Sequence, residues 1–578
     1  MNKQPTNAPT SSTTALRHGG RVLADQLAAL GAEMLFCVPG ESFLGLLDGL
    51  YDHRDQIKVI TCRHEAGASN MADAYAKMTG KPGICAVTRG PGATNASNGI
   101  HTGFQDSSPM IVLVGQVGRD MVDREAFQEI DYRRMFGEMT KWVAQIDDAK
   151  RIPEYLARAW NVALSGRPGP VVLALPEDVL SEIVATPDVQ PKPVAESAPT
   201  PKAMGQLEDL LASAKQPLLV VGGPAWSPAC AQAASGFAER LGLPVAASFR
   251  CQDYIDNGHE NYVGAIGIAP SPELIRRIRE DVDLLVAVGP RFGEMTTQGY
   301  SLLDIPNPRM AFVHVHPGPE ELGQVYAPDL AINATPSAFW AATEAVADGD
   351  GRARWADWRA QKRADYLAYL APTKVPGLLN MSEVIRHIDE TMPADTVVAN
   401  GAGNYSVWVH RFHRHRAYRT QLAPTSGSMG YGVPAAIAAK LVDPDRPVIS
   451  IAGDGCFLMT AQELATARQH DANVIFLVVN NGMYGTIRMH QERNYPGRPL
   501  ATALNNPDFV AYAKAFGMEG ERVDRTEDFP AAFARARAAG NGYLIELVVD
   551  PEALTPSQTL SAARAQGEKR LLQETSRS

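Results

Sequence analysis

The chain has 578 residues, of which 45% are hydrophobic and 20% are charged, and its formal net charge is −10. This length predicts about three domains, and the composition is that of an ordinary globular protein. The excess of acidic residues argues against a nucleic-acid partner and against binding to an anionic membrane.

Cysteine usage and hydropathy indicate the compartment. The six cysteines are scattered without CxxC pairs, which predicts a reducing compartment, the cytoplasm, with neither a disulfide framework nor a zinc site. No apolar run approaches the roughly 18 residues of a transmembrane helix, so no membrane span is expected. The polar start, residues 1–15, is expected to be a flexible tail and not a signal peptide.

Three blocks of alternating apolar strands and helical stretches follow one another, which is the pattern of parallel sheets. We therefore predict an α/β fold with three consecutive parallel-sheet α/β domains, at residues 16–185, 204–345 and 376–550. A linker rich in Pro, Ala and Ser is expected at residues 186–203. A polar, loosely packed tail is expected at residues 551–578.

The first block carries three segments with residues suited to chemistry. Glu41 lies just after the expected strand at residues 34–38, where α/β proteins place ligands; it is either a proton donor or acceptor or a helix N-cap without chemistry. Glu65 is expected to open an Ala-rich helix, where apolar surroundings would favour its protonated form. The alternative for Glu65 is a carboxylate that complements the helix dipole. Residues 88–99 are rich in Gly and Asn and predict a turn that approaches a flat ring closely, or a plain βα loop.

Residues 410–419 (HRFHRHRAYR) are a short, dense basic run near the start of the third block. We interpret this run as a solvated helix face or an oligomer contact in preference to a polyanion site.

Residues 447–484 are the most informative stretch. Two apolar runs, at residues 448–452 and 474–479, predict buried parallel strands, and residue 457 to about residue 469 predicts a helix between them. A right-handed crossover then sets the strands side by side, so Asp454 and Asn481 follow them at one edge of the sheet. The alternative is an ordinary β-α-β unit with turn residues.

Oxygen atoms at that edge predict a metal site. Asp454 offers a carboxylate, Asn481 an amide oxygen and Met483 its backbone carbonyl, a donor set that suits Mg²⁺ shared with a diphosphate. Gly455 permits a tight turn, and a helix N-terminus at Cys456 would aim free N–H groups at the same spot.

The GDG…NN pattern resembles the thiamine diphosphate (ThDP) motif, and the chain from about residue 18 to 560 resembles the acetolactate synthase (acetohydroxyacid synthase large subunit) branch of the ThDP enzymes. The resemblance implies a pyrimidine-binding first domain, a central domain and a diphosphate-binding third domain. It implies ThDP and Mg²⁺ as cofactors. It also implies that the first domain of one copy and the third domain of another share a site, so that a homodimer is the minimum unit and a homotetramer is expected.

The resemblance further implies roles for matching residues. Glu65 matches the acid that protonates the aminopyrimidine ring, which favours removal of the thiazolium C2 proton. Gly427 matches the carbonyl that accepts a hydrogen bond from the amino group of that ring. Met429 matches the wedge that bends the cofactor and brings this group near C2, with a core methionine as the alternative. The other positions match residues around the ring, the diphosphate or the metal: Pro91, Asn95, Gly403, Asn404, Tyr405, Asp454, Gly455, Cys456 and Asn481.

Residues near the substrate are less certain from the pattern. Gln128, with Phe127 beside it, matches the pocket for pyruvate, and Lys141 matches a lysine close to that pocket; the alternatives are a surface glutamine, a core phenylalanine and a surface lysine. Most acetolactate synthases have Gly where Glu41 stands, and biosynthetic ones have Trp where His490 stands. The roles of Glu41 and His490 therefore stay open.

The central domain resembles the FAD-binding domain of acetolactate synthases, in which the flavin takes no net redox part. Arg291 fits the start of the family's Arg-Phe motif, but the Asp-Asp-Arg that follows in the family is replaced here by Gly293, Glu294 and Met295. The lost arginine normally faces the substrate cleft. Whether FAD binds is thus left open.

We predict a ThDP- and Mg²⁺-dependent enzyme that decarboxylates a 2-oxo acid and joins the remainder to a second carbonyl, as in acetolactate synthesis. One alternative is a ThDP-dependent 2-oxo acid decarboxylase or aldehyde lyase, which Glu41, Met295 and His490 favour. Another is a non-catalytic binding protein on the same scaffold. The donor and acceptor substrates and any regulatory subunit are not determined by the sequence.

Overall fold

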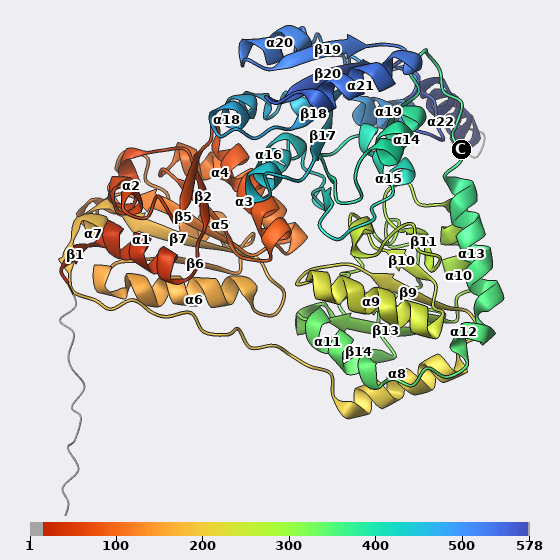
Figure 1. Cartoon of the computed structure of the whole chain (residues 1–578), viewed down its shortest axis with the longest axis horizontal. Coiled ribbons are helices and arrows are strands. Elements are labelled where there is room, and N and C mark those ends of the chain that lie inside the picture. Colours follow the sequence, from red (N-terminus) through yellow and green to blue (C-terminus); the bar gives the residue numbers. More distant parts are fainter. Residues whose placement is uncertain (1–14, 576–578) are drawn as a thin grey trace, which may run out of the picture.

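The computed structural model describes residues 15–575, so the tail expected at residues 1–15 lies almost entirely outside the described residues. Within that range the chain forms three lobes, each built on a six-stranded sheet (Figure 1). Neighbouring strands in these sheets run parallel, and parallel strands need crossover helices on the sheet faces. The predicted fold class is confirmed.

The first domain lies at the left of Figure 1 and has the strand order β3-β2-β4-β5-β7-β6. Its central strands β4 and β5 are buried along their whole length, because helices cover both faces of the sheet. The strands are β2 (Met34–Cys37), β3 (Lys58–Thr61), β4 (Gly83–Val87), β5 (Met110–Gln116), β6 (Trp142–Gln145) and β7 (Pro170–Pro176). The helices are α1 (Gly19–Ala29), α2 (Leu44–Tyr51), α3 (Glu65–Thr79), α4 (Pro91–Asp106), α5 (Tyr132–Phe136), α6 (Ile152–Leu164) and α7 (Glu177–Ser181).

The central domain has the strand order β11-β10-β9-β12-β13-β14. Its strands are β9 (Pro217–Val221), β10 (Val245–Ala247), β11 (Tyr262–Ala265), β12 (Leu284–Val288), β13 (Ala311–His316) and β14 (Leu330–Asn333). Its helices are α8 (Pro201–Ser213), α9 (Pro228–Leu241), α10 (Pro272–Glu280), α11 (Pro336–Ala342), α12 (Gly351–Arg354) and α13 (Ala356–Tyr369).

The third domain, at the top of Figure 1, has the strand order β16-β15-β17-β18-β20-β19. Its strands are β15 (Val397–Asn400), β16 (Gln421–Leu422), β17 (Val448–Gly453), β18 (Ile475–Asn480), β19 (Glu519–Val523) and β20 (Tyr543–Val548). Its helices are α14 (Met381–Thr391), α15 (Tyr405–Phe412), α16 (Gly432–Val442), α17 (Asp454–Phe457), α18 (Leu464–Gln469), α19 (Gly485–Asn494), α20 (Phe509–Ala515), α21 (Phe529–Ala538) and α22 (Leu560–Thr575).

Strands β17 and β18 are adjacent and parallel, as the crossover argument predicts. The single helix predicted between them is wrong, because the segment is divided into α17, the 3₁₀ helix η7 (Ala461–Glu463) and α18. Thr460 interrupts it, with a φ of −140°, and the Thr460 hydroxyl donates to the Gly430 carbonyl at 2.7 Å. Residue periodicity does not report such a tertiary bond.

The first and third domains pack together through α3, α4 and α16, and their hydrophobic core is continuous. The Tyr431 hydroxyl donates to Asp73 at 2.6 Å, and Lys77 pairs with Asp73 at 2.8 Å. The Thr425 amide donates to Asp106 at 2.7 Å. These polar contacts join the two domains, so loops near this interface are held from both of them.

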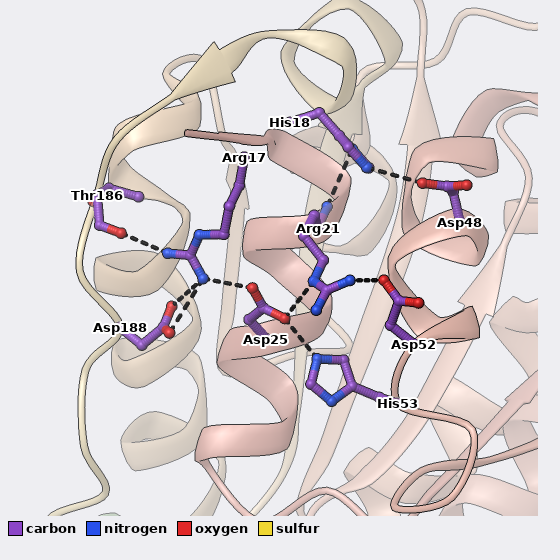
Figure 2. A network of polar contacts seen from close by, with 9 residues as sticks. All are labelled: Arg17, His18, Arg21, Asp25, Asp48, Asp52, His53, Thr186 and Asp188. Atoms are coloured by element: carbon purple, nitrogen blue, oxygen red, sulfur yellow. Dashed lines mark hydrogen bonds and ion pairs between the residues drawn. The ribbon is translucent and has the colours of Figure 1, made fainter. Parts of the chain in front are cut away.

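A polar network fastens the beginning of the linker to the first domain (Figure 2). Asp25 accepts hydrogen bonds from Arg17 at 2.6 Å, from Arg21 at 2.7 Å and from His53 at 2.6 Å. Arg17 also donates to the carbonyl of Thr186 at 2.5 Å. Beside this network, β1 (Arg17–His18) pairs with β8 (Ile183–Val184) in the antiparallel sense.

The interpretation of residues 410–419 as a solvated helix face is wrong. His410, His413 and His415 are buried, and burial lowers the pKa of His413 to about 4. Asp389 accepts hydrogen bonds from two arginines of the run. The basic residues therefore belong to packed structure beside the central domain, where Asp389 pairs with two of the arginines.

The tail expected to pack loosely after Leu554 contains α22, which lies against α19. Arg564 donates two hydrogen bonds of 2.9 Å to Glu492, and Ala563 is fully buried. A Cβ on Gly567 would come within 2.3 Å of the Glu492 carbonyl, so the small residue permits close helix contact. Within residues 15–575 no helix has the length and apolar character to cross a bilayer.

Candidate cofactor site

Asp454 is held firmly at the carboxyl end of β17. It is the first residue of α17 and its exposed fraction is only 3%. Its Oδ1 accepts the Gly455 amide at 2.9 Å, and its Oδ2 accepts the Gly482 amide at 2.9 Å and the Asn506 side-chain amide at 2.8 Å. Burial raises the pKa of Asp454, and these three donors oppose that rise.

Asn481 and Met483 lie at the end of the neighbouring strand β18. The Asn481 Oδ1 accepts the Met483 amide at 3.2 Å. The Gly482 carbonyl accepts the Leu504 amide at 2.8 Å, and Met483 forms a bridge with Ala503. Asp454, Asn481 and Met483 therefore meet at one edge of the sheet, as the sequence predicts, and the segment near residue 503 supports them.

This donor set fits a magnesium ion. Asp454 pairs with no lysine, arginine or histidine in the part of the chain that the structure describes, although it is a buried carboxylate. Residues 15–575 contain no cluster of three or more His, Cys, Asp or Glu side chains that could hold a metal. A cation here would depend on one carboxylate, an amide oxygen and a carbonyl, and Mg²⁺ uses such a set when a phosphate and water complete its shell.

The helix N-terminus predicted near Cys456 is shorter than expected. Helix α17 is a single turn that begins at Asp454, and its Gly455 amide bonds back to the Asp454 carboxylate. The Cys456 thiol lies 3.1 Å from the Tyr405 hydroxyl and accepts the Gly430 amide at 3.2 Å. Cys456 therefore joins three loops around the site, and burial raises the pKa of its thiol.

The loop after β15 carries Gly403, Asn404 and Tyr405. Gly403 has a φ of +149°, and the Asn404 amide donates to the Thr486 hydroxyl at 2.9 Å. The same hydroxyl donates to the Asn404 Oδ1 at 2.9 Å. Because Thr486 lies in α19, just after Met483, this loop and the loop carrying the metal-ligand candidates are fixed to each other.

Gly427 and Met429 lie in a turn that faces the first domain of the same chain. Gly427 has a φ of +71° and an added Cβ there would meet nothing within 4 Å, so its glycine serves the backbone conformation. The neighbouring Ser428 donates to Asn98 of α4 at 3.1 Å. Met429 is half-buried and packs against the shared core of the two domains.

Glu65 begins α3, as predicted, and is 9% exposed. The Asn95 side-chain amide donates to Glu65 Oε2 at 3.0 Å. A Cβ on Gly92 would lie 3.3 Å from Glu65 Oε1, so this position leaves room for the carboxyl group. Glu65 is thus oriented by α4 with one carboxyl oxygen engaged by an amide.

Pro91 and Asn95 belong to α4, and the turn predicted over residues 88–99 is wrong beyond Gly90. Pro suits the first position of a helix, where its missing N–H costs nothing. A Cβ on Gly99 would come within 2.2 Å of the Ser69 hydroxyl oxygen. The small residues that resemble a turn therefore allow α4 to pack closely on α3.

Glu41 and Gln128 lie at the same edge of the first sheet as Glu65. Glu41 begins the 3₁₀ helix η1 (Glu41–Phe43), is exposed, and approaches Arg89 at 3.7 Å. Arg89 also donates to the Phe127 carbonyl at 3.0 Å. Gln128, with a φ of +67°, packs against Gly90. Phe127 is 70% exposed, so its interpretation as a core residue is wrong.

Three other residues singled out from the sequence lie elsewhere. Lys141 precedes β6 at the amino edge of the sheet, where it donates to the Ser165 carbonyl at 2.5 Å and where burial lowers its pKa to about 8. Met295 is exposed at a cleft between the domains. His490 is exposed on α19.

The cleft that Met295 lines has a volume of about 820 Å³ and is bounded by all three domains. Arg291 and Trp226 line it from the central domain, and Asp106 lines it from the first. Gly223 also lines the cleft, and its glycine is explained by packing, because a Cβ there would lie 1.7 Å from the Gly289 carbonyl oxygen.

Sequence reasoning missed two residues that shape the site. Asn506 donates to Asp454 and, at 2.9 Å, to Asn480. Glu463 is a fully buried carboxylate that accepts the His64 amide at 2.9 Å at the start of α3. Both lie far along the chain from the residues they contact, so no local pattern reveals them.

Sequence models of three domains match the chain in order. They are "Thiamine pyrophosphate enzyme, N-terminal TPP binding domain" at residues 17–135, the central domain of the same enzymes at residues 204–343, and "Thiamine pyrophosphate enzyme, C-terminal TPP binding domain" at residues 401–547. The fold and these matches together define a thiamine pyrophosphate enzyme. In an enzyme of this class, a cofactor site like the candidate site described here is expected.

Comparison with curated relatives shows to which family of thiamine pyrophosphate enzymes the chain belongs. The acetolactate synthase large subunit of Corynebacterium glutamicum is 31% identical, with 96% of this chain and 91% of the relative covered. The enzyme of Parasynechococcus marenigrum is 33% identical over 92% of this chain and 87% of the relative. The isozyme 2 large subunit of Escherichia coli is 29% identical over 92% and 96%. The chain belongs to the acetolactate synthase family, which confirms the resemblance.

Proposed function

We propose that this ThDP-dependent enzyme converts two pyruvate molecules into 2-acetolactate and CO₂. When bound, ThDP supplies a carbon nucleophile that adds to the oxo carbon and takes up the electron pair left by departing CO₂. The single observation that carries the proposal is the presence of two half-sites in different domains. Glu65 is oriented by Asn95 in one domain. Asp454, beside Asn481 in another, is a buried carboxylate that pairs with no lysine, arginine or histidine among residues 15–575.

In this proposal Glu65 is the catalytic acid. Its protonated carboxyl group would donate a hydrogen bond to the aminopyrimidine ring of ThDP, whose chemistry requires loss of the thiazolium C2 proton. Asn95 orients the carboxyl group. Pro91 would line the ring from the start of α4, the Gly427 carbonyl would accept a hydrogen bond from its amino group, and Met429 would support the cofactor.

The third domain would hold the diphosphate. Asp454, Asn481 and the Met483 carbonyl would hold Mg²⁺, which would offset the charge of the diphosphate. The loop of Gly403, Asn404 and Tyr405, with Gly455 and Cys456, would surround the phosphates. This assignment is supported by the bonds that fix these loops to one another.

Glu41 and Gln128 are proposed to face the substrate. Both lie at the carboxyl edge of the first sheet, near Glu65, and Arg89 links their segments. At this place the Gln128 amide would donate a hydrogen bond to the product oxyanion, and the protonated form of Glu41 would supply the proton that neutralises it. Variants of each that raise KM or lower kcat for pyruvate would assign the role.

The assembly is proposed to be a homodimer or a homotetramer in which the first domain of one copy completes the third-domain site of another. Exposed apolar side chains beside both half-sites support this, with Phe127 at 70%, Leu458 at 38% and Met459 at 49% exposure. Six free, buried cysteines support a cytoplasmic location. An FAD, if this member binds one, would occupy the cleft of about 820 Å³, and the absorbance spectrum of the purified protein tests it.

Purified protein with ThDP and Mg²⁺ should convert pyruvate into acetolactate. Acetaldehyde as the main product would instead favour a decarboxylase, and cofactor binding without turnover on any 2-oxo acid would favour a binding protein. A mixture of Glu65→Gln and Asp454→Asn chains, refolded together, distinguishes shared from unshared sites. Shared sites restore about a quarter of the activity, because one site in each mixed dimer is intact, whereas sites within one chain restore none.

A further inference from the structure

Arg250 is a central-domain residue that reaches the third domain. It follows β10, and its exposed fraction is 6%. Its Nη2 donates to the Gly401 carbonyl at 3.0 Å, and its Nη1 donates to the Pro424 carbonyl. The backbone of Arg250 has a φ of +59°, an uncommon conformation for a residue with a side chain, which the surrounding structure must hold at a cost.

The two carbonyls that Arg250 binds belong to the two cofactor loops, defined as residues 401–405 and residues 424–429. Gly401 lies two positions before Gly403 and packs against Cys456, since an added Cβ would lie 2.6 Å from its sulfur. The Pro424 carbonyl also accepts the Gly427 amide at 3.1 Å. A single guanidinium thus joins the loop of the diphosphate candidates to the turn that presents Gly427.

The two terminal nitrogens of Arg250 are satisfied by these carbonyls, whereas its Nε is buried without a partner among the described residues. Arg250 makes no ion pair within the described part of the chain, and burial lowers its pKa to about 10. A buried cation is costly unless its donors are satisfied. The loops and the guanidinium therefore stabilise each other in one arrangement.

Neighbouring residues dock the domains independently of Arg250. The Gln252 amide donates to the Gln421 side chain at 2.8 Å, and Asp253 accepts the Thr420 amide at 3.0 Å. The guanidinium is therefore not the sole tie between the domains, and its removal should loosen the cofactor loops without separating the lobes.

We propose that Arg250 is a positioning residue for the cofactor, which sets from the central domain the spacing of the two loops that hold ThDP. The proposal rests on the proposed function, since it needs ThDP to bind between these loops. According to this proposal, the central domain contributes directly to the affinity for ThDP, whether or not the central domain itself binds a ligand.

The test measures ThDP affinity, by quenching of tryptophan fluorescence in excess MgCl₂, for the full chain and three variants. Arg250→Met should weaken ThDP binding about tenfold or more, because charge-assisted bonds to both loops are lost. Arg250→Lys should have a smaller effect, since the ammonium keeps the charge and hydrogen-bond donors although it does not reproduce the planar fork. The matched control is Arg363→Met, because Arg363 binds the carbonyls of Asn257 and Tyr262 within the central domain.

Hydrogen exchange of the cofactor-free proteins separates positioning from folding. Amides of residues 401–405 and 424–429 should exchange faster in the Arg250→Lys protein than in the control, while those of β9 and β12 stay protected. Wild-type-like ThDP affinity in either folded Arg250 variant, with or without a lower Tm, would overturn the proposal. Failure of the wild-type protein to bind ThDP would instead refute the proposed function.

Discussion

Removing the Asn506 side chain should weaken the proposed magnesium site without touching a metal ligand. Asn506→Ala deletes the 2.8 Å bond to Asp454 Oδ2 and the 2.9 Å bond to Asn480. Asp454 then keeps only the Gly455 and Gly482 amides. Its carboxylate loses the donor that comes from outside the two strand-end loops, so its orientation is less restricted.

The magnitude follows from the kind of bond that is lost. A hydrogen bond to a charged group contributes roughly 1.5–3 kcal/mol and a neutral one roughly 0.5–1.5 kcal/mol. Outer partners of metal ligands typically change metal affinity by about 10- to 100-fold, which corresponds to about 1.4–2.7 kcal/mol. We expect the half-saturating Mg²⁺ concentration to rise within that range.

The assay is a Mg²⁺ titration at saturating ThDP, followed by tryptophan fluorescence and in parallel by acetolactate formation. Asn505→Ala is the matched control, because Asn505 is the exposed neighbour in the same loop. An unchanged Mg²⁺ requirement in folded Asn506→Ala, or an equal change in both variants, would refute the reasoning that Asn506 aims the metal-binding carboxylate.

Three further outcomes are expected. Glu65→Gln should lower kcat by about 10²-fold or more with ThDP affinity nearly unchanged, and a normal kcat would remove Glu65 from catalysis. Asp25→Asn should lower the free energy of unfolding by about 2 kcal/mol at pH 7, measured by urea denaturation. Burial alone would raise the pKa of Asp25, but bonds from His53 and two arginines lower it. The Asp25 carboxylate therefore stabilises the fold above its unfolded-state pKa, and the difference from wild type should vanish as the pH falls through the lower folded-state pKa; a difference that persists in acid contradicts this. A hydrogen bond from Arg564 is the main cause that lowers the pKa of Glu492 to about 2. Arg564→Ala should therefore expose α22 to limited proteolysis while the Tm of the main transition changes little. Unchanged proteolysis would show that apolar packing is sufficient to hold α22.

Much of the third domain could be predicted because its signals are local. The apolar runs that form β17 and β18 are buried on both faces, and burial on both faces demands such runs. Asp454 and Asn481 follow these runs directly, so parallel pairing brings them together. The predicted helix between the strands fails at Thr460, where a bond to Gly430 outweighs helical periodicity.

Two predictions made from local composition are wrong, because they did not take into account the elements that pack against these segments. In the basic run at residues 410–419 the histidines are buried and the arginines are half-buried, because Asp389 and backbone carbonyls bind these arginines. The Gly- and Asn-rich segment after Gly90 is helical because α3 passes so close that larger side chains would clash. In both cases the partner comes from another element, and local propensity is only a weak prior against such contacts.

The sequence by itself determined the three α/β blocks, the edge at which Asp454 and Asn481 meet, and the helix that Glu65 begins, because each depends on residues a few positions apart. Only the tertiary structure decided which side chains hold those groups in place. Asn506 contacts Asp454 across 52 positions, and Arg250 contacts Gly401 across 151. Contacts over such separations depend on how the strands and domains pack, and a local pattern of residues carries no record of them.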